Sequence, residues 1–347
     1  MRTIAPNLFL PPPIRRLSRR NGWRKSGLYA TSLNIFQPAN HFASPAAKGA
    51  ILDQIALPVP TISDAAFDLH GPAEPTRPVI LSVPHAGRAY PADLLAAARV
   101  KPPILRRMED RWADLLAHRA VATGFTVLIA RAPRAMIDMN RHEREIDPGM
   151  IADVPRDAPL HSSAKLRGGL GLFPRRLPGA HELWLRPMTW GEARGRIETL
   201  HRPYHAMLAR LMAAARQAHG HAILIDLHSM PPLPVTPGQD AAGVVLGDRF
   251  GRSASTRLVA QAAEIIAGRG IAVAQNHPYA GDHILDRHGR PERGAHAIQV
   301  EIDRSLYLDA ALEGIGPGLP RMQALVSDLA AMLADELPRA GYAMAAE

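Results

Sequence analysis

Apolar runs of strand length alternate along the chain with longer segments whose apolar positions recur at helical spacing. The runs with the length and branched content of buried strands are 78–83, 125–130, 135–139, 222–225, 243–246, 271–274 and 297–302. Helical spacing predicts helices over 91–99, 104–123, 189–218, 255–267 and 320–337, and 168–174 and 276–295 are predicted to be loops. Strands that alternate with helices are typical of an α/β fold.

One apolar run, Ala222–Ile225, opens directly onto Asp226, His228 and Ser229 before Pro231 stops the strand. Polar residues at the carboxyl end of a buried strand are typical of ligand sites in open α/β sheets. Side chains alternate along a strand, so Asp226 and His228 point to the same side, where the carboxylate can orient the imidazole. The alternative is a hydrogen-bonded histidine at a cap, with no metal or catalytic use.

Two further strands carry polar residues that could do chemistry. His85 directly follows the strand at 78–83, and Gly87 allows the backbone to turn sharply beside a ligand, although an exposed loop histidine would have the same sequence. In the last predicted strand, alternation places Gln299 and Glu301 on the side opposite the apolar residues. Such a carboxylate needs a partner, which is either a metal-bound water or an arginine in a buried ion pair.

Charged residues elsewhere allow a carboxylate site. Asn140 and Arg141 directly follow a predicted strand, and a guanidinium with a neighbouring amide suits a bound carboxylate, as it also suits a surface ion-pair cluster. Glu109 and Asp110 lie beside the apolar face of a predicted helix, where most acids are simply solvated.

Composition limits the chemistry that is open to the chain. Its 347 residues include no cysteine, which excludes disulfides, thiolate ligands and cysteine nucleophiles, so any metal must be held by His, Asp or Glu. No uncharged run reaches the length of a membrane span. We therefore expect a cytoplasmic protein with no membrane partner.

The net charge of +9 comes almost entirely from the first 50 residues, which hold eight basic residues and no acid. The rest of the chain has a net charge of +1, so we expect no nucleic-acid partner for its globular part. We predict a disordered basic extension over 1–55 and a single α/β metallohydrolase domain over 56–347. The extension has three explanations: a disordered arm, a start codon assigned too far upstream, or an organelle transit peptide.

Seven motifs, taken in order, resemble the N-formylglutamate amidohydrolase family, a branch of the zinc-carboxypeptidase-like hydrolases. They are V-P-H-A-G at 83–87, E-D-R-W-A-D at 109–114, R-A-M-I-D-M-N-R at 134–141, G-L-F-P at 171–174, R-P-Y-H at 202–205, D-L-H-S at 226–229 and G-A-H-A-I-Q-V-E-I at 294–302. The resemblance covers about 75–335. It implies a three-layer sandwich with a central mixed β-sheet flanked by helices.

The resemblance also implies one zinc ion, with His85 and His228 as two of its ligands. The carboxypeptidase pattern H-x-x-E is broken here, because Arg88 stands three residues after His85, so the acidic ligand must come from elsewhere. We assign Asp110, which lies in the family's acidic motif, with Glu109 as the alternative.

The reaction that the resemblance implies is hydrolysis of N-formyl-L-glutamate to formate and L-glutamate, as in histidine degradation. Zinc would polarise the carbonyl and lower the pKa of its water toward ~7, and Glu301 would accept the proton and pass it to the leaving amine. Asn140 and Arg141 match the pair that holds the substrate carboxylate. Arg134 and Arg304 are candidates for the other carboxylate or for the developing oxyanion.

Other functions stay open at this point. Chain spacing does not define the volume of the acyl pocket, so the substrate could be another N-acyl amino acid. Gly281-Asp282 stands where relatives often have Gly-Gly, a departure that bears on substrate selection. A nucleic-acid-binding protein that acts through its basic arm and a metal-free relative with a structural role are the alternatives from other classes. The oligomeric state is not predicted.

Overall fold

The computed structural model describes residues 57, 60–177, 179, 182–235 and 240–341. The predicted basic extension over 1–55 lies outside these residues, and the predicted domain boundaries stay predictions. No helix among the residues described has both the length and the apolar character that crossing a membrane requires.

A mixed β-sheet of eight strands, in the order β1-β2-β4-β3-β5-β8-β6-β7, forms the centre of the described chain. The strands are β1 (Ile62–Ser63), β2 (Phe67–His70), β3 (Val79–Val83), β4 (Thr126–Ala130), β5 (Ala222–Met230), β6 (Val244–Gly247), β7 (Val273–Gln275) and β8 (Ala295–Asp303). The four central strands are parallel, while β2 runs antiparallel to β4 and β6 antiparallel to β8.

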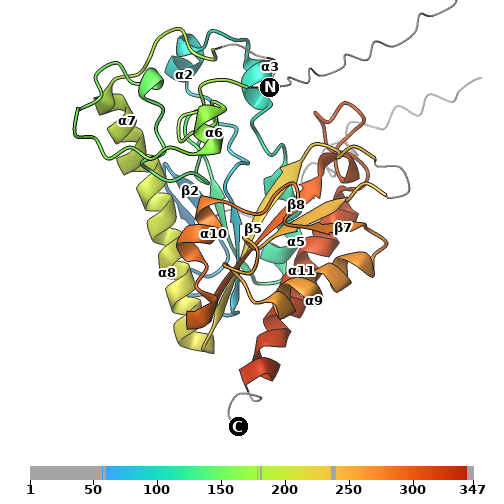
Figure 1. Ribbon diagram of the computed structural model, residues 1–347. Coiled ribbons are helices and arrows are strands. Elements are labelled where there is room, and N and C mark those ends of the chain that lie inside the picture. Colours follow the sequence, from blue (N-terminus) through green and yellow to red (C-terminus); the bar gives the residue numbers. More distant parts are fainter. Residues whose placement is uncertain (1–56, 58–59, 178, 180–181, 236–239, 342–347) are drawn as a thin grey trace, which may run out of the picture. The chain divides into compact units, whose positions relative to one another are not determined.

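Alternate side chains of the central strands enter two separate hydrophobic cores. Leu81, Ile225 and Val300 pack in the core formed with α4 (Ala113–Leu116), α5 (His118–Ala122), α9 (Thr256–Ala267) and α11 (Leu319–Gly341). Ile80 and Leu224 point to the other face, where α8 (Arg202–His219) packs. Helices therefore cover both faces of the sheet (Figure 1), and the predicted three-layer sandwich is confirmed.

The long helix predicted at 189–218 forms as three consecutive segments, α7 (Trp190–Arg196), a π-helical turn (Ile197–His201) and α8. It begins in a capping box, in which the Thr189 hydroxyl accepts from the Glu192 amide and the Glu192 carboxylate accepts from the Thr189 amide. It ends at Gly220, whose φ of 78° lies in the left-handed region that glycine adopts most easily.

The single helix predicted at 104–123 is wrong. The chain instead forms α3 (Pro102–Arg106), a turn, α4 and α5, because Trp112 takes a left-handed conformation with φ of 59°. The turn is held by a long-range contact, since the Asp110 amide donates to the His85 carbonyl at 3.0 Å. The spacing of apolar residues along the segment does not indicate this contact.

The strand predicted at 135–139 is also wrong, because this segment is a turn. The amides of Met136 and Ile137 both donate to the Pro133 carbonyl, and the Asp138 amide donates to the Leu172 carbonyl. The predicted loop at 276–295 contains two short helices, α10 (His283–His288) and a 3-10 turn at Pro291–Arg293. The remaining short helices are α2 (Ala92–Ala97), α6 (Ala164–Arg167) and the 3-10 turns at Pro148–Met150 and Arg304–Leu306.

The strand that begins at Ala222 continues through the polar residues to Met230. It pairs with β8 over its whole length, from Ala222 opposite Ala295 to Met230 opposite Asp303. Asp226 and His228 are therefore held in strand geometry, and the site forms on the carboxyl half of these two strands.

We expect Gly87→Ala to lower the free energy of unfolding by ~1–3 kcal/mol, measured by chemical denaturation. A Cβ at Gly87 would lie 2.2 Å from the Ala132 carbonyl oxygen, so the loop after β3 would have to move. Gly195→Ala is the matched control, because a Cβ there meets nothing within 4 Å and alanine favours the helix. An equal loss of stability in both variants would contradict the packing of this loop.

Candidate functional site

A cavity of about 980 Å³ lies at the carboxyl ends of β3, β5 and β8. Eight residues that the sequence singled out line it: His85, Asp110, Arg134, Asn140, Arg141, His228, Glu301 and Arg304. Asp226 lies beneath this wall, fully buried, and Glu109 is not part of the lining. The structure thus brings together residues from segments that are far apart in the sequence.

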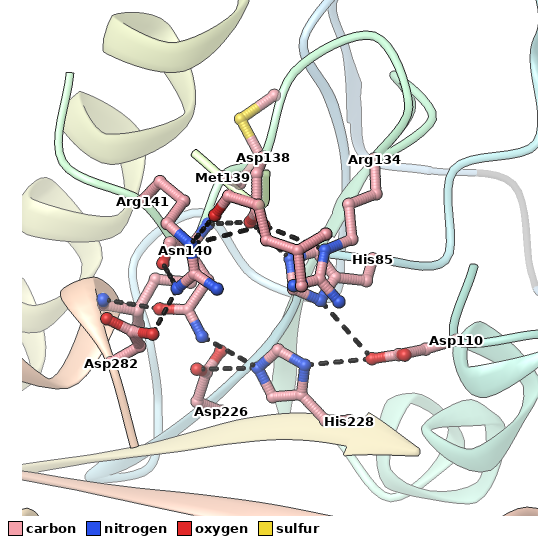
Figure 2. Close-up of polar contacts among 12 residues, drawn as sticks. His85, Asp110, Arg134, Asp138, Met139, Asn140, Arg141, Asp226, His228 and Asp282 are labelled. Atoms are coloured by element: carbon pink, nitrogen blue, oxygen red, sulfur yellow. Dashed lines mark hydrogen bonds and ion pairs between the residues drawn. The ribbon is translucent and has the colours of Figure 1, made fainter. Parts of the chain in front are cut away.

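Three buried side chains converge at the base of the cavity (Figure 2). Asp110 Oδ2 lies 2.9 Å from His228 Nδ1 and 3.5 Å from His85 Nδ1. The two imidazole rings meet edge to face, with centroids 4.8 Å apart. His85 Nδ1 is buried and makes no hydrogen bond, so this nitrogen is available as a ligand.

A second carboxylate orients each of the two imidazoles. His85 Nε2 donates to Asp138 Oδ1 at 2.7 Å, and His228 Nε2 donates to Asp226 Oδ2 at 2.9 Å. The other nitrogen of each ring, Nδ1, faces Asp110, and His228 Nδ1 also donates to that carboxylate. Histidine ligands of metals are commonly oriented by a carboxylate in this way.

The charges at this point favour a cation. Burial alone would raise the pKa of Asp110, but the hydrogen bond from His228 and the charges of His228 and His85 hold it well below its usual range. Burial likewise opposes the charged form of His228, yet Asp226 and Asp110 raise its pKa well above the usual value. Carboxylates that draw a proton onto His228 attract a divalent cation for the same reason.

The donor set fits zinc. His85, Asp110 and His228 each offer one ligand atom, and these atoms lie within 4.8 Å of one another. Two imidazole nitrogens and one carboxylate oxygen are a common catalytic zinc set, which leaves a further position for water or substrate. Glu109, the alternative acid, points elsewhere, because its carboxylate accepts from Tyr90 Oη and from Arg111 Nη1, each at 2.8 Å.

Glu301 lies beside this group, because it is directly opposite His228 in the β5–β8 pairing. Its carboxylate accepts a hydrogen bond from Gln299 Nε2 at 2.9 Å, and the residue as a whole is 8% exposed. Burial raises the pKa of Glu301, although the neighbouring His228 charge opposes the change. A carboxyl group with a raised pKa is suited to both accepting and returning a proton near neutral pH.

Asn140 and Arg141, the pair predicted to hold the substrate carboxylate, both have hydrogen-bond partners within the protein. Asn140 Oδ1 accepts from the Ile284 amide at 2.8 Å, and the Arg141 guanidinium donates to the Asp282 carboxylate. Asp282 also accepts from Lys165 at 2.5 Å. Burial would raise the pKa of Asp282, but Arg141 and Lys165 lower it, so the carboxylate is charged at neutral pH.

The two other candidate arginines also hold carboxylates. Arg134 Nε donates to Asp138 Oδ2 at 2.8 Å, so it positions the carboxylate that orients His85. Arg304 Nη2 donates to the Glu109 carbonyl at 2.6 Å and lies 3.3 Å from Asp110 Oδ1. Both guanidinium groups line the cavity, yet each already has a structural partner there.

Sequence reasoning overlooked Asp138 and the support beneath Asp226. Asp138 lies inside the R-A-M-I-D-M-N-R motif. The available signal was that His85, like His228, needs a carboxylate to orient its ring if it binds a metal. Ser82 Oγ donates to Asp226 Oδ1 at 3.0 Å and lies 2.8 Å from Tyr204 Oη. No local pattern indicates this contact, because Ser82 and Tyr204 belong to different layers of the fold.

Several known proteins resemble this chain over most of its length. N-formylglutamate deformylase from Pseudomonas putida is 28% identical over 243 residues, which cover 67% of this chain and 82% of that protein. The crystal structure of N-formylglutamate amidohydrolase from Ralstonia eutropha JMP134 matches with a TM-score of 0.73 and 33% identity, over 80% of this chain and 99% of that one. A gene product from Agrobacterium tumefaciens, with a TM-score of 0.51 and 18% identity over 79% of this chain and 96% of its own, shares the fold.

The family model described as N-formylglutamate amidohydrolase matches residues 77–308. This match spans more than half of the chain and includes all seven motifs, from V-P-H-A-G to G-A-H-A-I-Q-V-E-I. The resemblance seen in the sequence is confirmed, and the chain belongs to the N-formylglutamate amidohydrolase family.

Proposed function

We propose that this protein is a zinc-dependent amidohydrolase that cleaves N-formyl-L-glutamate to formate and L-glutamate. The observation that carries the proposal is the convergence of His85, Asp110 and His228 beside Glu301 in one cavity. The relatives named N-formylglutamate deformylase support the substrate. A small-molecule substrate also fits the size of the cavity.

In this proposal, His85 Nδ1, His228 Nδ1 and Asp110 Oδ2 hold one zinc ion. When bound, zinc supplies a Lewis acid for the amide carbonyl and increases the acidity of a water molecule. Glu301 accepts the proton of the attacking water on a carboxylate oxygen and then donates it to the nitrogen of the leaving amine. Gln299 keeps the Glu301 carboxylate in place through its 2.9 Å hydrogen bond.

Cationic side chains of the cavity would bind the carboxylates of the substrate. Arg141 and Asn140 are the proposed anchor for one of them, after Asp282 has moved from the guanidinium. Arg134 and Arg304, which line the same cavity, are the proposed donors to the other carboxylate or to the developing oxyanion of the substrate. Arg144 is an additional candidate, because it lines the cavity and has no salt bridge among the described residues.

A second candidate substrate is an N-acyl amino acid without a side-chain carboxylate. The pairing of Asp282 with Arg141 and Lys165 favours it, since a resident carboxylate competes with an anionic side chain for the same cations. The two candidates are separated by an assay of formate or acetate release on protein of measured zinc content. The substrates are N-formyl-L-glutamate, N-formyl-L-glutamine and N-acetyl-L-glutamate. Absence of turnover on all three by zinc-loaded protein would overturn the proposed activity.

Cytoplasmic location and a role in histidine degradation stay predictions. The nucleic-acid-binding alternative depends on the basic arm, which lies outside the described residues.

We expect Glu301→Gln to lower kcat by ~10²-fold or more while zinc content is retained, because the amide keeps the shape of the side chain but cannot accept a proton. Glu145→Gln is the control for kcat, since Glu145 lines the same cavity and interacts with Ser163 and Arg141 rather than with the imidazoles. Turnover near the wild-type value in zinc-loaded Glu301→Gln would rule out Glu301 as the base.

We expect Asp138→Asn and Asp226→Asn each to weaken zinc binding by ~10–100-fold, because each removes the carboxylate that fixes the tautomer of a ligand. Competition with a chromophoric chelator measures the affinity. Asp248→Asn is the control, because Asp248 is a buried carboxylate that is paired with Asn276 outside the cavity. Unchanged zinc affinity in both site variants would contradict the proposed ligand set.

We expect Asp282→Asn to lower KM for N-formyl-L-glutamate by ~10-fold with little change in kcat, because the variant frees Arg141 and Lys165 for the substrate; the change corresponds to ~1.4 kcal/mol. Asp286→Asn is the control, because Asp286 is an exposed carboxylate on α10 that pairs with Arg249, in the turn after β6, and not with Arg141. A higher KM in Asp282→Asn would instead mean that Asp282 helps to bind the substrate.

A further inference from the structure

Three other buried histidines meet behind the loop that carries Asn140 and Arg141. His201 lies in the π-helical turn and His205 one turn later on α8, so both point from the same helix face, and His283 begins α10. Their ligand nitrogens lie within 4.8 Å of one another, the same spacing that the His85, Asp110 and His228 set satisfies. Figure 1 shows α8 and α10 side by side, so this group joins two elements.

The hydrogen bonds of this group fix which nitrogens carry protons. His201 Nε2 donates to the Arg141 carbonyl and His205 Nε2 to the Met139 carbonyl, each at 2.9 Å. Nδ1 of each ring therefore carries a lone pair. Metal-binding histidines are commonly held in this manner, with the second nitrogen bonded to a backbone carbonyl.

Two nitrogens of the group have no hydrogen-bond partner although they are buried. These atoms are His201 Nδ1 and His283 Nε2. A buried acceptor without a donor lowers the stability of the fold. Phenylalanine rings at these positions would fill the space without that cost, so the histidines need another explanation. His205 Nδ1 accepts a hydrogen bond from His288 Nε2 at 3.1 Å, so a metal ion at this nitrogen would displace that hydrogen bond.

Histidine binds metals as the neutral imidazole, which is the form that burial favours. Burial lowers the pKa of His201 to about 4 and that of His283 to about 3, and the charge of Arg287 contributes to both shifts. Burial also holds the pKa of His205 well below its usual value.

We propose that His201, His205 and His283 bind a second transition-metal cation, of the zinc class, at a structural site. Imidazole donors without thiolate or carboxylate suit Zn²⁺ and its neighbours rather than Mg²⁺ or Ca²⁺. The site shares no ligand with the proposed catalytic set, so it does not depend on the proposed function. Through the Met139 and Arg141 carbonyls, it would hold the segment that contains Asn140 against α8.

The test is the zinc stoichiometry of the full chain, stripped with a chelator, dialysed against Zn²⁺, freed of excess metal by gel filtration and analysed for elements. We expect about two zinc ions in the wild type. His283→Phe keeps an aromatic ring, removes one ligand and should bind about one. His228→Ala should also retain about one, at the histidine site, and the double variant none.

His142→Phe is the matched control, because His142 contacts His283 but is not one of the three ligands, and it should bind two ions. One zinc ion in the wild type and none in His228→Ala would overturn the second site and leave the catalytic proposal intact. One ion in the wild type that is lost in His283→Phe and kept in His228→Ala would support the second site and remove the catalytic one. These two comparisons distinguish the failures.

A measurement that does not rely on His283→Phe uses the His228→Ala protein alone. Added Zn²⁺ should raise its Tm, because the proposed ion joins α8 to α10. Added Co²⁺ should give the visible absorption bands of a cobalt ion that is bound by three imidazoles. If folded His228→Ala shows no rise in Tm and none of these bands, the proposal is overturned.

Discussion

The candidate site depends on the pairing of β5 with β8. These strands run parallel and in register over nine residues each, which places His228 next to Glu301 and Asp226 next to Gln299. Because every second side chain faces the same way, two pairs of polar residues share one face while Ile225 and Val300 enter the opposite core. A shift of one residue would put the carboxylates in the apolar core, so burial of the apolar side chains determines where the chemistry occurs.

Buried carboxylates are the second common feature of the site. Asp110, Asp138 and Asp226 are all within hydrogen-bonding distance of an imidazole, and Arg134 and Arg304 neutralise two of them from behind. Unpaired buried charges are costly, so these contacts offset the cost of burying the carboxylates and hold the imidazole rings in place. The arginines that line the cavity therefore first support the ligand set.

The turn at 138–141 links the three parts of the molecule that bear on function. Asp138 orients a proposed ligand of the catalytic ion, Asn140 and Arg141 face the cavity, and the carbonyls of Met139 and Arg141 accept from the second group of histidines. A turn, unlike a strand, can direct successive side chains and carbonyls to different sides. The turn that replaces the predicted strand therefore contacts both groups of histidines.

Local periodicity alone determined the α/β class, the central strands and the positions of His85, His228 and Glu301 relative to them, because alternation of side chains is a property of the strand itself. Tertiary structure decided the rest: the break of the helix at Trp112, the convergence of Asp110 rather than Glu109, the role of Asp138 and the pairing of Arg141 with Asp282. These features depend on contacts between residues that are up to about 140 positions apart, such as Arg141 and Asp282. Such contacts are selected by packing and charge in three dimensions, and a one-dimensional pattern does not record them.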